Sequence, residues 1–224
     1  FGNDARATGA SSTASGDGSR ATAANTSAYG RIAQATGANA SAFGNNAQAT
    51  GASSTAAGDS SLASNTFTSA FGRLAWATGV NASAYGNIAV ANAASATAVG
   101  DTSTASAANA SAFGRLALAS AANATAGGND SWAGGVNSSA YGNQSLANGA
   151  SSVAVGDTAR AQAASAVAVG HDSLAAGPSA IAVGHGAQAI NSVAVGAFAY
   201  AANGGAAFGD GARGGGADRR DVPR

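Results

Sequence analysis

The chain has 224 residues and a formal net charge of zero, with ten Lys plus Arg, ten Asp plus Glu, and no cysteine. Such sparse and balanced charge argues against nucleic-acid binding, which needs a basic surface to neutralise phosphates. The sequence contains no run of about 18 apolar residues, the length that predicts a membrane-spanning helix. The absence of cysteine is compatible with export without indicating it.

A repeat of 14 residues runs through most of the chain. Its marker is a glycine that recurs without a missed step, at Gly2, Gly16, Gly30, Gly44, Gly58, Gly72, Gly86, Gly100, Gly114, Gly128, Gly142, Gly156, Gly170 and Gly184. A strict period below the roughly 20 to 50 residues of most helical and propeller repeats predicts a β-solenoid with one repeat per coil. Phe1 and Gly2 already match the end of a strand, so we expect a piece of a longer chain.

Each coil has the pattern of two short strands. Alanine stands two residues before every repeat glycine, alanine or serine three residues after it, and alanine again five residues after it. Larger residues alternate with these small ones, and alternation with period two predicts strands with one face that admits only methyl-sized groups. We therefore predict an all-β fold, a parallel β-roll or β-solenoid of 14-residue, two-strand coils. The repeat glycine marks the first turn, where it tolerates a positive φ or close backbone approach.

Taken in chain order, coils of constant length continue to about residue 184, and the last coils are shorter. We assign residues 1–209 to the repeat domain and residues 210–224 to a Gly-rich, then charged, tail or linker. In the first two thirds of the chain the residue after the glycine cycles through Asn, Asp and Arg every three coils. Because stacked coils lie about 4.8 Å apart, this cycle predicts ion pairs between turns. The predicted pairs are Asp17–Arg31, Asp59–Arg73 and Asp101–Arg115.

The residue just before each repeat glycine is apolar in most coils. Its neighbour is the invariant alanine of the interior, so this column faces outward and would form an apolar stripe larger than the few hundred Å² that a monomer usually exposes. We therefore predict an oligomer with this stripe at its centre. The predicted interface residues are Tyr29, Phe43, Phe71, Tyr85, Val99, Phe113, Tyr141, Val155, Val169, Val183 and Val195.

The repeat resembles the head repeat of trimeric autotransporter adhesins, the YadA-like head, most closely in Ser152–Ala163 and Ala166–Gly177. The resemblance covers residues 1–209. It implies a left-handed β-roll and a homotrimer packed about a common axis by the apolar column. It also implies a bacterial cell-surface protein that is exported and anchored in the outer membrane through a C-terminal region absent here, and that binds host cells or extracellular matrix.

A second outward column lies on the other strand of each coil, and its middle section is apolar and holds both tryptophans. Tryptophan is favoured in binding hot spots, although it is also a residue that packs in grooves. We predict possible ligand-binding residues at Leu62, Trp76, Val90, Leu118, Trp132 and Leu146.

Catalytic and metal-binding patterns are weak. His171 and His185 occupy the same turn position in adjacent coils, with Asp172 nearby, but two histidines without a third fixed ligand favour ordinary turn residues over a metal site. No glycine loop opens a helix to hold phosphate, and no pair of carboxylates converges. We predict no enzyme activity, no cofactor and no metal.

The sequence therefore predicts the head domain of a surface adhesin, with a homotrimer and a host cell-surface or matrix protein as its partners. We expect neither nucleic acid nor membrane contact for this piece. One alternative is a passive spacer in a surface fibre. The other is an ice-binding solenoid, because Thr8, Thr22, Thr36 and Thr50 form an outward column, but Ser64, Asn92 and Gly134 interrupt it.

Overall fold

The computed structural model describes residues 2–215, and every regular element among them is a β-strand. The chain divides into two compact units, Phe1–Leu116 and Ala117–Arg224. Counted over both units, the strands make a parallel β-solenoid of about fifteen turns. The predicted fold class is therefore confirmed, while the handedness and the trimer stay predictions. No helix among the described residues is long and apolar enough to cross a membrane.

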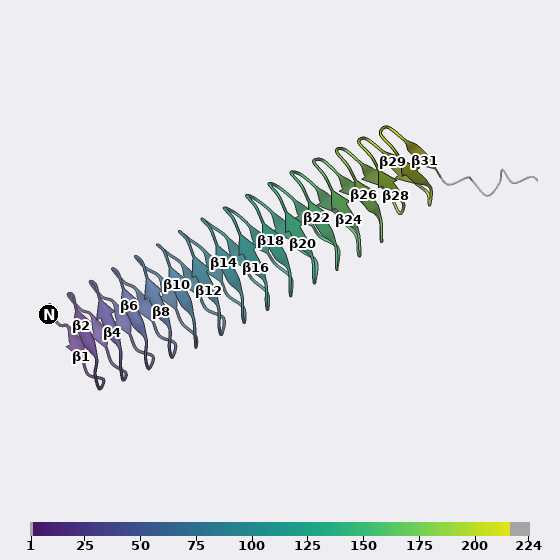
Figure 1. The fold of residues 1–224 in the computed structure, drawn as a ribbon. Helices are drawn as coiled ribbons and strands as arrows, with labels where there is room; N and C mark the ends of the chain where they lie inside the picture. The colour runs from purple at the N-terminus through teal and green to yellow at the C-terminus, as the bar shows by residue number, and fades with distance from the viewer. Residues whose placement is uncertain (1, 216–224) are drawn as a thin grey trace, which may run out of the picture. The chain divides into compact units, whose positions relative to one another are not determined.

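In the first unit, odd-numbered strands pair with one another in one sheet and even-numbered strands in a second sheet (Figure 1). All pairs are parallel, and partners are 14 residues apart, as in Phe71 beside Tyr85. The odd strands are β1 Arg6–Ala7, β3 Arg20–Ala21, β5 Gln34–Ala35, β7 Gln48–Ala49, β9 Leu62–Ala63, β11 Trp76–Ala77, β13 Val90–Ala91 and β15 Thr104–Ala105. The even strands are β2 Thr13–Ser15, β4 Ser27–Tyr29, β6 Ser41–Phe43, β8 Thr55–Ala57, β10 Ser69–Phe71, β12 Ser83–Tyr85, β14 Thr97–Val99 and β16 Ser111–Phe113.

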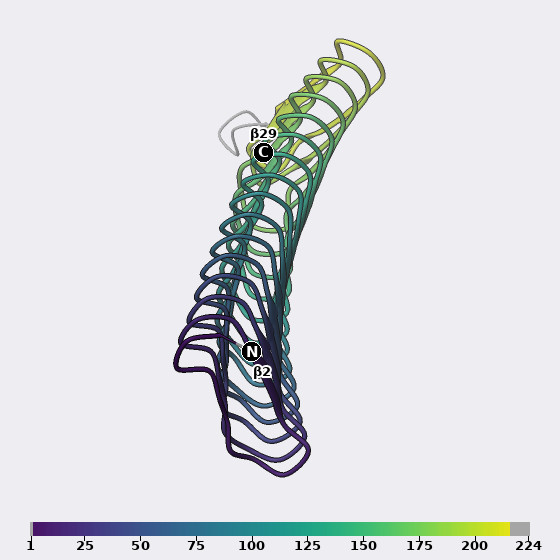
Figure 2. The same cartoon turned by 90° about the vertical axis from the view of Figure 1, so that its left-hand side faces the viewer.

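The second unit has the same two parallel sheets, but the spacing of partners shortens in its last turns, where Ile181 pairs with Val193 and Tyr200 with Arg213. In Figure 2 the successive turns of each unit follow one another as flattened loops. Its odd strands are β17 Leu118–Ala119, β19 Trp132–Ala133, β21 Leu146–Ala147, β23 Arg160–Ala161, β25 Leu174–Ala175, β27 Gln188–Ala189, β29 Tyr200–Ala202 and β31 Arg213–Gly215. Its even strands are β18 Thr125–Gly127, β20 Ser139–Tyr141, β22 Val153–Val155, β24 Val167–Val169, β26 Ile181–Val183, β28 Val193–Val195 and β30 Ala206–Phe208. The charged part of the predicted tail, residues 217–224, lies outside the described residues.

The interior between the two sheets consists of small side chains, as predicted. The alanines two residues before and five residues after each repeat glycine are almost all fully buried, for example Ala98, Ala154 and Ala161. Each alanine stacks on its equivalents in the neighbouring turns, as Ala154 does on Ala140 and Ala168. Because an alanine side chain buries only about one methyl's worth of apolar surface, this interior stabilises each turn weakly.

Several serines of the interior donate their hydroxyl to a carbonyl oxygen within their own turn. Ser61 donates to the carbonyl of Gly58, and Ser145 donates to that of Gly142, both at 3.0 Å. Thr26 and Thr68 do the same at the second turn. A buried hydroxyl without such a partner costs free energy. The local bond removes this cost at Ser61 and Ser145, whereas the buried hydroxyls of Ser19, Ser138 and Ser152 have no partner among the described residues.

The repeat glycines have both properties that the sequence predicted for them. Gly156, for instance, has a φ of 133°, and a Cβ added there would lie 2.6 Å from the carbonyl oxygen of Gly170 in the next turn. Left-handed φ values of this kind favour glycine. Glycine is therefore required here for two independent reasons, the positive φ and the close approach of the next turn.

Candidate functional sites

The predicted interface residues form one outward ladder, which we call the aromatic ladder. Each of its members is the last residue of an even-numbered strand. The aromatic members and Val155 are between 38% and 46% exposed in the single chain, and the other valines are half-buried. Tyr29 stacks on Phe43 at 5.5 Å between ring centroids, and Phe71 stacks on Tyr85 at 5.2 Å. Within each unit the structure thus brings these residues together on one face.

A feature of this ladder that sequence reasoning missed is the fit between Gly127 and Tyr141. A Cβ added at Gly127 would lie 2.7 Å from the Cδ1 atom of Tyr141. The missing side chain in one turn therefore leaves room for the ring of the next. The signal in the sequence was a glycine in a column otherwise held by larger residues.

The predicted ligand-binding residues lie on the odd-numbered strands, on the opposite side of the coil from the aromatic ladder, and we call them the tryptophan column. Leu62, Val90, Leu118 and Leu146 are half-buried. Trp76 is 46% exposed and Trp132 is 43% exposed. Trp76 pairs with Leu62 and Val90 on the two neighbouring strands, and Trp132 pairs with Leu118 and Leu146 in the same way.

The indole of Trp132 is held in place by its own turn and the one before it. Its Nε1 donates to the hydroxyl of Ser120 at 3.1 Å, and a Cβ added at Gly134 would lie 3.0 Å from the same nitrogen. The indole is therefore fixed at its nitrogen while 43% of the residue stays exposed. A side chain that is already ordered loses less conformational entropy on binding.

The predicted ion pairs between turns are wrong where the described residues test them. Among residues 2–215 no ion pair joins Asp17 to Arg31 or Asp59 to Arg73. Instead Asn45 donates its side-chain amide to Asp59 at 2.7 Å. The cycle of Asn, Asp and Arg therefore places an asparagine donor one turn before the carboxylate, so a neutral amide makes the contact assigned to arginine.

The equivalent bonds follow the same direction along the chain. Asn87 donates to Asp101, and Asn143 donates to Asp157, each at 2.7 Å. Arg31 donates to the side-chain oxygen of Asn45 at 3.4 Å. These contacts are exposed, so each contributes modestly to stability.

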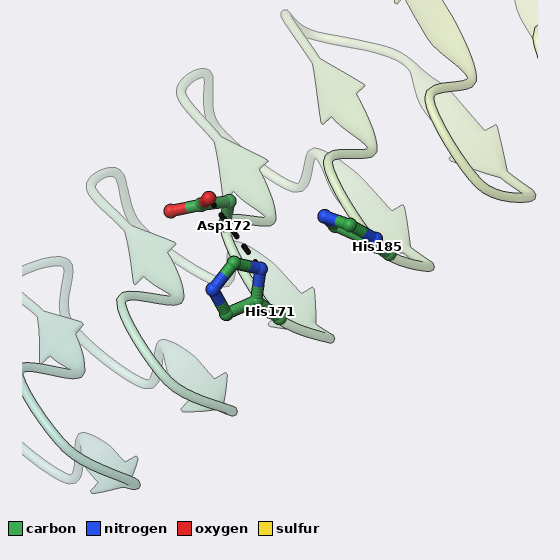
Figure 3. A group of neighbouring side chains, drawn as sticks. All are labelled: His171, Asp172 and His185. Atoms are coloured by element: carbon green, nitrogen blue, oxygen red, sulfur yellow. Dashed lines mark ion pairs between the residues drawn. The ribbon is translucent and has the colours of Figure 1, made fainter.

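His171 and His185 lie together with Asp172 in the second unit (Figure 3), and Asp157 lies beside His171. The ring centroids of His171 and His185 are 4.9 Å apart. His171 Nε2 lies 3.4 Å from Asp157 Oδ2, and its Nδ1 lies 3.4 Å from Asp172 Oδ2. The Thr158 hydroxyl bonded to Asp172 lowers the pKa of that carboxyl, with the nearby His171 and His185 acting in the same direction.

A parallel solenoid with small, fully buried side chains and long apolar ladders is the architecture of a structural repeat protein. The chain's own repeats place it in a family. The model of the YadA head domain repeat, two copies long, matches residues 2–31, 35–61, 63–89, 91–117, 133–159, 147–173 and 161–187. The chain belongs to this family and is a YadA-like head domain of the trimeric autotransporter adhesins. No curated protein matches the chain significantly.

Proposed function

We propose that this chain forms the homotrimeric head of a bacterial surface adhesin, exported and anchored in the outer membrane through a C-terminal region outside this chain. The observation that carries the proposal is the aromatic ladder. Membership of the YadA head family supports the number of chains and the cell-surface location.

The energetics of the single chain favour association through this ladder. The interior offers only methyl-sized burial, whereas full burial of a Phe or Val side chain contributes roughly 1.5–3 kcal/mol. Tyr29, Phe43, Phe71, Tyr85 and Phe113 each leave more than a third of their surface in water. A repeating ladder of this kind exceeds the apolar patches that monomers expose, which is typical of an interaction surface.

Assembly is tested by placing charge in the ladder. Phe71→Asp combined with Phe113→Asp is expected to convert the trimer into monomers, because burying unpaired carboxylates near the axis costs far more than the rings gain. Light scattering coupled to gel filtration measures the mass. The matched control is Gln34→Asp with Gln48→Asp, which adds the same charges on the opposite sheet and should leave the trimer intact. A folded, monodisperse monomer for the unmodified chain would contradict the proposal.

For the adhesive surface we propose the tryptophan column, with host cell-surface or extracellular-matrix protein as the ligand. Trp76 and Trp132 present exposed indoles flanked by apolar residues. A trimer displays each of them three times, and multivalent display can raise avidity by roughly 10²–10⁴ without a strong single site. Weak individual contacts are therefore sufficient for attachment.

The test is Trp76→Ala combined with Trp132→Ala, measured as attachment of the purified trimer to host cells and to immobilised matrix proteins. Attachment should fall while the trimer mass and melting temperature stay those of the unmodified chain. Arg20→Ala, on an exposed position of the same sheet before the apolar section, is the control and should attach normally. Unchanged attachment by the double variant would show that the column is not the adhesive face. Attachment that persists when all the coils are removed from a larger adhesin would favour a passive spacer.

A further inference from the structure

The cluster formed by His171, Asp172 and His185 belongs neither to the aromatic ladder nor to the tryptophan column. One ligand atom from each of the three residues lies within 4.8 Å of the others (Figure 3). His171 is in the turn between β24 and β25, and His185 is in the equivalent turn between β26 and β27. Their spacing is therefore set by the stacking of coils, which lie about 4.8 Å apart.

The third group of the cluster is Asp172, which the turn places beside His171. Asp172 follows His171 directly, at the turn position that has a positive φ, here 54°. Its carboxylate lies beside His171 Nδ1 at 3.4 Å. His185, one turn further on, is held against Phe198, with 4.8 Å between the ring centroids.

Asp157 gives the cluster a second layer. It lies one turn before His171, and its Oδ2 is 3.4 Å from His171 Nε2. A proton on Nε2 directed at this carboxylate leaves the lone pair of Nδ1 facing Asp172. Metal-bound histidines almost always donate their other ring N–H to a carboxylate, carbonyl or water in this way.

We propose that His171, Asp172 and His185 bind a divalent transition-metal ion of the Zn²⁺ type, with Asp157 orienting the ring of His171. Two imidazoles and one carboxylate are a ligand set that zinc takes, with a fourth position left for water. Zinc–ligand bonds of about 2.0–2.2 Å put tetrahedral donors roughly 3.4 Å apart. The donor atoms are within 4.8 Å, so the site closes by rotation of exposed side chains.

The ligand set also predicts which ions are not bound. Ca²⁺ and Mg²⁺ require mainly oxygen ligands, and Asp172 is the only carboxylate among the three proposed ligands. The two carboxylates, Asp157 and Asp172, balance the charge of one divalent ion. The site thus needs no group from outside the second unit.

The experiment is a calorimetric titration of the full chain with zinc chloride after treatment with a chelator. We expect one Zn²⁺ per chain and no heat of binding with calcium. Loss of a hydrogen-bond partner behind a metal ligand typically lowers metal affinity about 10–100-fold. His171→Gln and His185→Gln each remove a ligand itself, so each should lower zinc affinity by at least that much or abolish binding. Asp157→Asn should weaken binding within that range. The matched control is Asp101→Asn, at the same turn position as Asp157 but without histidine neighbours, and its affinity should equal that of the unmodified chain.

A second readout separates metal binding from damage to the fold. Zinc should raise the melting temperature of the unmodified chain but not of His185→Gln, while both melt alike in the presence of chelator. Asp172→Asn keeps the shape of the side chain and serves if a histidine variant fails to fold. The chain has only two histidines, so zinc affinity that survives both histidine substitutions would overturn the site. Absence of zinc binding by the folded, unmodified chain would overturn it as well.

Discussion

Replacing a repeat glycine by alanine has two costs in stability, one from the positive φ and one from crowding against the next turn. Two of these glycines allow the costs to be measured separately. At Gly156 an alanine would meet both, because φ is 133° and the new Cβ would lie 2.6 Å from the carbonyl oxygen of Gly170. Gly209 occupies the same column, with φ of 109°, but a Cβ there meets no atom of the described residues within 4 Å. The two positions are therefore a matched pair within one unit.

The expected magnitudes follow from these two terms. An alanine held in a sparsely populated region of φ costs roughly 1–3 kcal/mol at either position. Overpacking against the rigid backbone of the next turn adds roughly 1–3 kcal/mol at Gly156 alone. Gly156→Ala should therefore lower the free energy of unfolding by about 2–6 kcal/mol, and Gly209→Ala by about 1–3 kcal/mol.

Thermal unfolding followed by circular dichroism measures the difference. For a chain of this size each kcal/mol shifts the melting temperature by roughly 2–4 °C, so the larger cost at Gly156 is resolvable. Equal losses for the two variants would show that contact between turns does not limit this column. A greater loss at Gly209 would refute the reasoning altogether.

Three further predictions concern the interior. Ala154→Leu should destabilise by about 1–3 kcal/mol or prevent folding, because the fully buried alanine stacks on Ala140 and Ala168 and has no room to expand. Arg160→Leu, at an exposed position on the other strand of the same coil, is its control, and an equally large loss of stability for that variant would contradict the inward placement of Ala154. Ser145→Ala should cost about 0.5–1.5 kcal/mol, since it removes a hydrogen bond to Gly142. Ser138→Ala should instead be neutral or stabilising in urea denaturation, because the buried Ser138 hydroxyl has no partner in the described structure; a loss as large as that at Ser145 would contradict this.

The outward and inward faces were predictable from the sequence for a simple physical reason. Equivalent residues of a strict repeat stack directly on one another, so the period sets the register, and the size of the residues in each column sets which side is buried. Ala154 beside Val155 illustrates both points, since the first is fully buried and the second is exposed. The outward positions of the aromatic ladder and the tryptophan column follow from this alternation.

Contacts between side chains of neighbouring turns were decided only by the tertiary structure. Register stacks Asn, Asp and Arg in one column of successive turns, but rotamers determine that Asp59 bonds to Asn45 and not to Arg73. The same holds for Asp172, which lies next to His171 in the sequence but takes part in a cluster with His185 because the turn directs its carboxylate there. Column patterns specify which residues are neighbours, whereas the local turn geometry and the reach of each side chain specify which of those neighbours meet.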